Sequence, residues 1–351
     1  MIVYYVNNSI HEIPSFVYIA RALGGVVLTN GSESFKILRE QYDDLPSEYY
    51  PTLAEVRLRM RELRPLAVIQ PDYTKHELAL DFETAHIQVF HGTSDKTYDL
   101  SHHVREYDFM LLPGERARRL KEEAGLLAPG NHAVVGYAKT DRVFRGELPR
   151  DLAVRNLGLD PHRPTILYAP TWRDHKQNSS LPKFGAEVML TAPADYNLVV
   201  KLHPNTKHYD RKYYGLAERA AATRANLKLL GYEHDIIPIM AAADLLICDI
   251  SAVAHEFLCF DRPYVFLDPR RLAIGRDKTW IWQCGPVVKK QGLVWPSVEE
   301  ALARPEKYAV QRRTALETVF FKPDGHAAER AAEAIKAFLA RRTRENNGME
   351  D

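Results

Sequence analysis

Several apolar runs in this chain stop abruptly at side chains that can bind anions or move protons. These are His91, Gly92 and Thr93 after IQVF, Lys201, His203 and Pro204 in or after NLVVKL, Asp249 and Ser251 after LLIC, and Thr171 and Arg173 after ILYAP. An imidazole titrates near neutral pH and can take a proton from an alcohol. Lysine, arginine and free backbone amides bind phosphate. Together these residue types indicate proton transfer beside a phosphate group.

His91 stands where a buried run turns polar. Gly92 allows a sharp turn or a close approach of the backbone to a ligand, and Thr93 can cap a following helix while leaving amides exposed. We interpret His91 as a candidate general base for an alcohol. The alternative is a structural histidine whose hydrogen bonds are satisfied within the protein.

The segment KLHPN combines a fixed charge with a tunable donor. Lys201 and His203 are two residues apart, so that on a strand they point to the same face. Pro204 ends the strand directly after His203. This pair suits a phosphate better than a carbonyl group. The alternative is that Lys201 extends to solvent and His203 packs against the proline.

The segment CDISAVAHEFLCF predicts a strand, a polar turn and a helix. Ser251 is the expected N-cap of a helix running through Phe257. The N-terminus of a helix attracts phosphate, so Asp249 and Ser251 are expected to border a diphosphate. Glu256 either bonds a ribose or faces water.

Two other turns supply cations. APTWRD places Thr171 and Arg173 in a loop, and FFKPDGHAAER places Lys322 and Arg330 around a turn. These cations can hold an anionic substrate. The structural alternatives are a loop anchored by Trp172 and an ordinary surface arginine.

The elements that position these residues read as buried strands alternating with amphipathic helices. Continuous apolar runs of this kind are typical of parallel sheets. The predicted strands lie within 2–6, 25–30, 65–72, 87–92, 108–114, 133–137, 165–172, 196–204, 227–233, 244–251 and 264–269, and predicted helices include 51–63, 114–127, 235–243 and 325–345. The alternation predicts βαβ units, with ligands beyond the carboxyl ends of the strands.

The alternation pauses at 141–163, a charged segment that we interpret as a linker with one short helix. The predicted fold class is therefore α/β, with two doubly wound, Rossmann-like domains facing one another across a cleft. The domains are expected at 1–148 and 149–325, followed by a C-terminal helix and frayed tail at 326–351.

Composition excludes several classes of protein. The 47 basic and 46 acidic residues argue against a dedicated nucleic-acid binder. The three cysteines form no CxxC pair, which argues against a disulfide framework and fits a reducing compartment. We find neither GxGxxG nor GxxxxGK[ST], which argues against a dinucleotide fold or a Walker ATPase.

We expect neither a cofactor nor a metal, because no acidic cluster of metal-ligand type stands out. No signal peptide and no apolar stretch of about 20 residues is evident. We therefore expect a cytoplasmic protein, with peripheral contact to the inner face of the membrane left open.

With these segments assembled, the sequence resembles the CDP-glycerol glycerophosphotransferases, which build teichoic acids and related capsule polymers. The resemblance is carried, in family order, by FHGTSDKTY, LLPG, VVGYAKTD, LYAPTWRD, VVKLHPN, ADLLICDISAVAHEFL, RPYVFLDP and FFKPDGHAAER. It implies a two-domain GT-B fold, with the acceptor side in the first domain and the nucleotide donor in the second. It also implies transfer of glycerol phosphate from CDP-glycerol to a hydroxyl of a lipid-linked or glycan acceptor, with release of CMP.

The resemblance also implies roles for particular residues. The catalytic histidines of the family match His91 and His203. The family motif DYSS reads DISA here, so that Ser251 matches the first serine and Ala252 replaces the second. Arg330 matches an arginine near the C-terminus. Alternatives left open are another donor such as CDP-ribitol, a GT-B glycosyltransferase that uses a nucleotide sugar, and a non-catalytic binder of nucleotide or polymer.

Overall fold

The chain folds into two compact units. The computed structural model describes residues 1–72, 75–90, 92, 100–173, 177–231, 235–275, 277–346 and 348. Unit 1 comprises the described residues of Met1–Thr93, Leu100–Arg145 and Glu317–Asp351, and unit 2 comprises those of Gly146–Leu316. The sequence-based boundary at 148/149 lies close to this division. The segment predicted as a separate C-terminal part, 326–351, belongs to unit 1.

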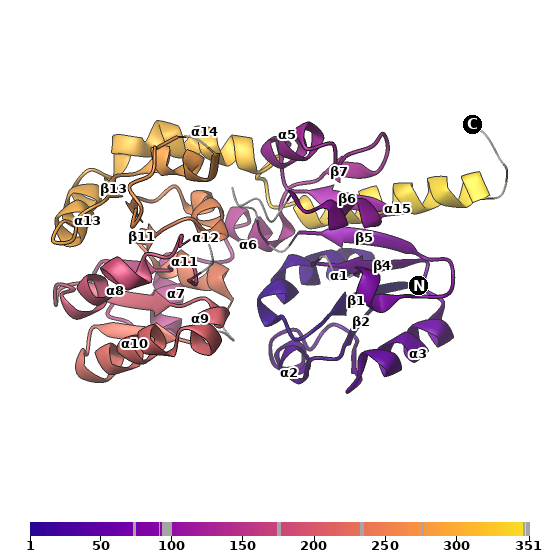
Figure 1. Ribbon diagram of the computed structural model, residues 1–351, viewed down its shortest axis with the longest axis horizontal. Helices are drawn as coiled ribbons and strands as arrows, with labels where there is room; N and C mark the ends of the chain where they lie inside the picture. Colours follow the sequence, from indigo (N-terminus) through magenta and orange to yellow (C-terminus); the bar gives the residue numbers. More distant parts are fainter. Residues whose placement is uncertain are drawn as a thin grey trace. The chain divides into compact units, whose positions relative to one another are not determined.

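Unit 1 is built on a parallel sheet (Figure 1). Among its described residues, the sheet has seven strands in the order β3-β2-β1-β4-β5-β6-β7. Their bounds are β1 Ile2–Val6, β2 Val26–Thr29, β3 Ser47–Tyr49, β4 Ala67–Gln70, β5 Ala85–Val89, β6 Phe109–Leu112 and β7 His132–Val134. The order reverses between β1 and β4, so the strand-end crevice of this sheet lies there.

Unit 2 repeats this arrangement. Its described residues form a six-stranded parallel sheet in the order β10-β9-β8-β11-β12-β13. The bounds are β8 Thr165–Tyr168, β9 Asn197–Lys201, β10 Leu227–Leu230, β11 Leu245–Cys248, β12 Tyr264–Leu267 and β13 Val287–Val288. Here the reversal falls between β8 and β11, and the carboxyl ends of β9, β8 and β11 are neighbours.

Every strand that the sequence predicts is present, and the α/β, doubly wound character of both units is confirmed. The central strands are buried on both faces, which explains their continuous apolar runs. Two further strands, β3 and β13, escaped prediction. Both lie at a sheet edge and have at most three residues, too few to produce a pattern.

Helices flank the strands in each unit. In unit 1 they are η1 Ile10–Ser15, α1 Val17–Leu23, α2 Ser32–Gln41, α3 Leu53–Leu63, α4 Lys75–Leu78, η3 His102–Glu106, α5 Glu115–Glu123, η4 Ala138–Thr140, α6 Asp141–Phe144 and α15 Ala327–Asn346. In unit 2 they are α7 Arg150–Asn156, α8 Leu181–Leu190, α9 Pro204–Tyr209, α10 Arg211–Thr223, α11 Ile236–Ala242, α12 Ala252–Glu256, η5 Phe257–Phe260, η6 Asp277–Cys284, α13 Val294–Ala303, η7 Pro305–Tyr308 and α14 Ala309–Val319, whose end from Glu317 onward is grouped with unit 1. No helix in the described part of the chain is long and apolar enough to cross a bilayer.

Local sequence explains how individual helices begin. Thr52 and Glu55 form a reciprocal capping box at the start of α3. Asp141 is buried and accepts hydrogen bonds from the backbone amides of Ala327 and Ala328, at 3.0 and 2.8 Å, which fixes the start of α15 in unit 1.

The structure differs from the predicted linker at 141–163 in its number of helices. It contains two short helices, α6 and α7, rather than one. Asp141 opens α6 as well as capping α15, so α6 belongs to the packed body of unit 1 and is not a spacer.

His86 links the stability of unit 1 to pH. It lies in β5, its ring nitrogen Nδ1 is 3.3 Å from Gln70 Oε1, and its side chain is buried. Burial, and then the positive charge of Lys75, lower the pKa of His86 from 6.5 to about 4. Between these two values the unfolded chain binds a proton that the folded chain does not. The free energy of unfolding therefore falls as the pH drops from 6.5 to 4, by about 3 kcal/mol from this residue.

We expect a His86→Gln variant to lose this contribution. Urea unfolding at pH 7 and pH 4.5 measures the free energy of unfolding of the native chain and of the variant. Between these two pH values the free energy of unfolding should fall less in the variant than in the native chain. Parallel pH profiles for the two proteins would contradict the assignment.

Candidate active site

The candidate residues of unit 2 gather where three neighbouring strands end. Thr171 follows β8, His203 follows β9, and Asp249 and Ser251 follow β11. Because β8 lies between β9 and β11, these segments share one edge of the sheet, at the reversal of strand order. Ligands of doubly wound sheets bind at such a position.

His203 is held as the N-cap of α9. Its backbone is extended, with φ −61° and ψ 142°, and its ring nitrogen Nδ1 accepts a hydrogen bond from the backbone amide of Asn205 at 3.2 Å. Since Nδ1 accepts, the proton of the neutral ring resides on Nε2, which makes Nε2 a donor. Pro204 occupies the first helical position, where its missing N–H costs nothing.

The indole of Trp172 lies beside this imidazole. The ring centroid of Trp172 lies 6.2 Å from that of His203 and 5.9 Å from that of Tyr209. Trp172 belongs to the loop after β8, so the two strand ends are in contact. Lys201, at the end of β9, is buried rather than extended into solvent.

Asp249 holds the loop after β8 in place. It is fully buried, and its two carboxylate oxygens accept hydrogen bonds from the amides of Thr171 at 2.9 Å and Ser180 at 2.7 Å. The hydroxyl of Ser180 also lies 2.9 Å from that of Tyr168. Asp249 therefore anchors the loop after β8 through the amide of Thr171, and its place beside a ligand stays a prediction.

Ser251 caps α12, as the sequence predicts. Its hydroxyl accepts from the amide of Val253 at 3.4 Å. The α-helix is shorter than expected: it begins at Ala252 and ends at Glu256, and a 3-10 turn follows. Glu256 is buried, so the alternative that it faces water is wrong, and a bond from Glu256 to a ribose stays a prediction.

Both predicted arginines contact protein carboxylates. Arg173 Nε lies 3.2 Å from Oδ2 of the buried Asp210, a partner that the sequence did not reveal. Arg330 lies in unit 1, where its guanidinium donates to both oxygens of Asp324 at 2.8 Å and to the carbonyls of Val135 and Lys322. Arg330 thus secures the start of α15 within unit 1, and its role in binding the donor stays a prediction.

The remaining predicted residues lie in unit 1. Gly92 follows β5 and is half-buried. His91 and Thr93 lie outside the described residues. Their assignment therefore remains a prediction.

A family comparison decides the class of the chain. Residues 52–337 match the profile of the family described as CDP-glycerol:poly(glycerophosphate) glycerophosphotransferase. The chain belongs to this family. The match includes both predicted histidines and every strand-end segment of unit 2.

Individual family relatives and structures agree with this assignment. The teichoic acid glycerol-phosphate primase of Bacillus subtilis (strain 168) is 26% identical over 162 residues, which cover 46% of this chain and 39% of the primase. The teichoic acid ribitol-phosphate primase of Bacillus spizizenii is 24% identical over 249 residues, 66% of this chain and 60% of that one. The chain thus spans less than two thirds of the length of these curated relatives.

A solved structure of the wall teichoic acid polymerase TagF, a variant soaked with CDPG, superposes with a TM-score of 0.69 at 15% identity. The superposition covers 98% of this chain and 89% of the solved chain. The shared fold is GT-B, as predicted.

Proposed function

We propose that the protein transfers glycerol phosphate from CDP-glycerol to an acceptor hydroxyl and releases CMP. The observation that carries this proposal is the imidazole of His203, fixed as the N-cap of α9 at the end of β9, the strand beside the reversal between β8 and β11. A neutral donor held in one orientation can bond a phosphate oxygen without reorganising during the reaction. The family match supports CDP-glycerol as the donor.

The proposed step is a displacement at the phosphorus that bears glycerol. The acceptor oxygen forms a new P–O bond, the bridging P–O bond to CMP breaks, and CMP leaves with the bonding electron pair. His91 takes the proton of the acceptor hydroxyl, and His203 donates to a phosphate oxygen as charge develops there. Lys201 supplies positive charge at the same strand end.

The residues proposed to bind the donor have two kinds of role. In this proposal Ser251, Ala252 and the loop from Thr171 to Arg173 line the nucleotide and its phosphates, while Asp249 acts by anchoring that loop. Gly92 and Thr93 belong to the His91 segment. No metal takes part in the proposed step.

We propose a lipid-linked or glycan acceptor, used at the inner face of the cell membrane. The thiols of Cys248 and Cys284 are free and buried, which fits a reducing compartment. The relatives named as teichoic acid primases support an acceptor of the teichoic acid type.

The test measures products formed with CDP-glycerol and a lipid-linked acceptor that carries glycerol phosphate. We expect one CMP for each glycerol phosphate gained by the acceptor. Release of CDP would indicate glycosyl transfer, and binding of CDP-glycerol without turnover would indicate a non-catalytic protein. Either result would overturn the proposal.

CDP-ribitol is the alternative donor. The similarity to a teichoic acid ribitol-phosphate primase, over 66% of this chain, is the observation that supports CDP-ribitol. Parallel assays with CDP-glycerol and CDP-ribitol at equal concentration separate the two, because the preferred donor has the larger kcat/KM.

A further inference from the structure

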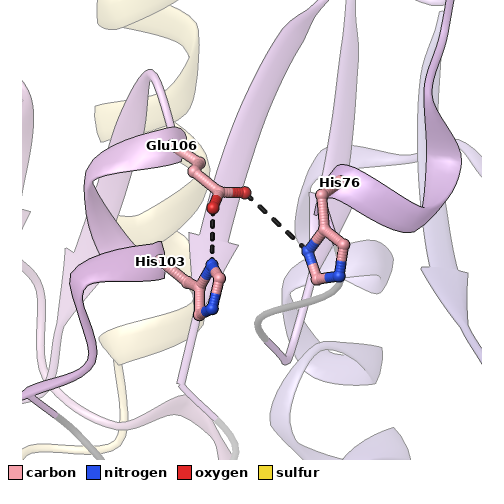
Figure 2. Close-up of side chains that lie close together, drawn as sticks. All are labelled: His76, His103 and Glu106. Atoms are coloured by element: carbon pink, nitrogen blue, oxygen red, sulfur yellow. Dashed lines mark hydrogen bonds and ion pairs between the residues drawn. The ribbon is translucent and has the colours of Figure 1, made fainter.

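A second group of chemically capable side chains lies in unit 1, and none of its members is a residue proposed for the transfer. Figure 2 shows His76 from α4 together with His103 and Glu106 from η3. The carboxylate of Glu106 lies between the two imidazoles. Its Oε1 is 2.6 Å from His103 Nδ1, and its Oε2 is 3.9 Å from His76 Nδ1.

The backbone brings these three side chains together. His103 and Glu106 are three residues apart in a 3-10 helix, where side chains at this spacing project from the same side. The ring of His76 stacks on that of His103, with centroids 5.4 Å apart and planes at 26°. One ligand atom from each of the three residues lies within 4.8 Å of the others.

We propose that His76, His103 and Glu106 bind one divalent transition-metal ion of the zinc class. Two imidazole nitrogens and one carboxylate oxygen form a recognised three-residue zinc ligand set, which leaves a fourth position for water. Ligands about 2.1 Å from a tetrahedral ion lie roughly 3.4 Å apart. The two nitrogen–oxygen separations, 2.6 and 3.9 Å, bracket that value, so small side-chain rotations would admit the ion.

The site is open to solvent. The exposed fractions of the side chains are 56% for His76, 39% for His103 and 33% for Glu106, so an ion can enter without unfolding. The ammonium of Lys75 donates to the backbone carbonyl of Glu106, and this nearby positive charge opposes a cation. We therefore expect weaker binding than at closed structural sites with four protein ligands.

A bound ion would join two segments that are distant in the sequence. His76 precedes β5, whereas His103 and Glu106 follow the 91–99 segment that contains His91. The ion would thus clamp the chain on both sides of that segment. It takes no part in the proposed transfer, and its binding can be tested without any assay of activity.

Calorimetric titration of the full chain with Zn²⁺ alone, after treatment with a chelator, tests the site. We expect one bound equivalent, and about a 10–100-fold loss of affinity in His103→Ala and Glu106→Gln. His162→Ala is the matched control, because His162 is an exposed histidine in unit 2. Equal Zn²⁺ affinity in the control and in both ligand variants would overturn the proposal.

Thermal unfolding supplies an independent readout. An ion that binds only the folded chain raises its melting temperature, so Zn²⁺ should raise the midpoint of the native chain and of His162→Ala but not of His76→Asn. His76 has the most exposed side chain of the three, so this variant should fold even if the others do not. The same zinc-induced shift in His76→Asn would contradict the assignment.

Discussion

His203→Asn is expected to lower kcat for CMP release by about 10²–10³-fold while leaving the fold intact. Asparagine is among the best N-cap residues, so its side-chain oxygen can replace Nδ1 as acceptor for the amide of Asn205. What the variant loses is the Nε2 donor. Because that donor is proposed to act on charge that develops in the transition state, the loss should appear in kcat rather than in KM.

The matched control is His208→Asn. His208 lies in the same short helix, α9, but is exposed. Steady-state CMP release and melting temperatures should be measured for both variants. Near-native turnover of His203→Asn would remove His203 from the mechanism, whereas equal losses in the two variants would indicate damage to the helix.

Asp249→Ala is expected to cost about 2–6 kcal/mol in the free energy of unfolding. The substitution leaves two buried amides, those of Thr171 and Ser180, without their acceptors, at about 1–3 kcal/mol each. Asp249→Asn should cost less, because its remaining carbonyl oxygen can still accept one of the two bonds. Turnover should fall in both variants, since the loop that carries Trp172 loses its anchor.

Urea unfolding followed by circular dichroism measures these costs. Asp195→Ala is a suitable control in unit 2, because Asp195 is exposed and its loss should change stability by less than about 0.5 kcal/mol. If Asp249→Ala were as stable as this control, the anchoring role would be wrong.

Sequence patterns predicted most of the fold, because buried parallel strands leave a strong local signal. The runs IVYYV and TILY need no tertiary information to be recognised, since both faces of each strand are covered. Edge strands such as SEY in β3 carry no such signal. The packing of α6 depends on Asp141, which caps a helix more than 180 residues away. No local pattern reveals such a contact, so the sequence predicts a linker there.

The candidate site was predictable in position but not in detail. Strand ends can be located from sequence, and Ser251 was identified as a cap on local grounds. The partners of buried polar groups could not be found in this way. Asp249 accepts hydrogen bonds from amides 78 and 69 residues away. Arg173 contacts Asp210, which lies between α9 and α10. Such pairs exist only once the chain has folded.

In the proposed transfer, His91 and His203 act in the same chemical step. The most direct test is single-turnover CMP release from CDP-glycerol, in the presence of acceptor, for His91→Ala, His203→Asn and the double variant. Groups that serve one transition state have strongly non-additive effects. We expect a large loss of CMP release in each single variant and little further loss in the double variant. Near-native CMP release by His91→Ala, or losses that multiply fully in the double variant, would contradict it.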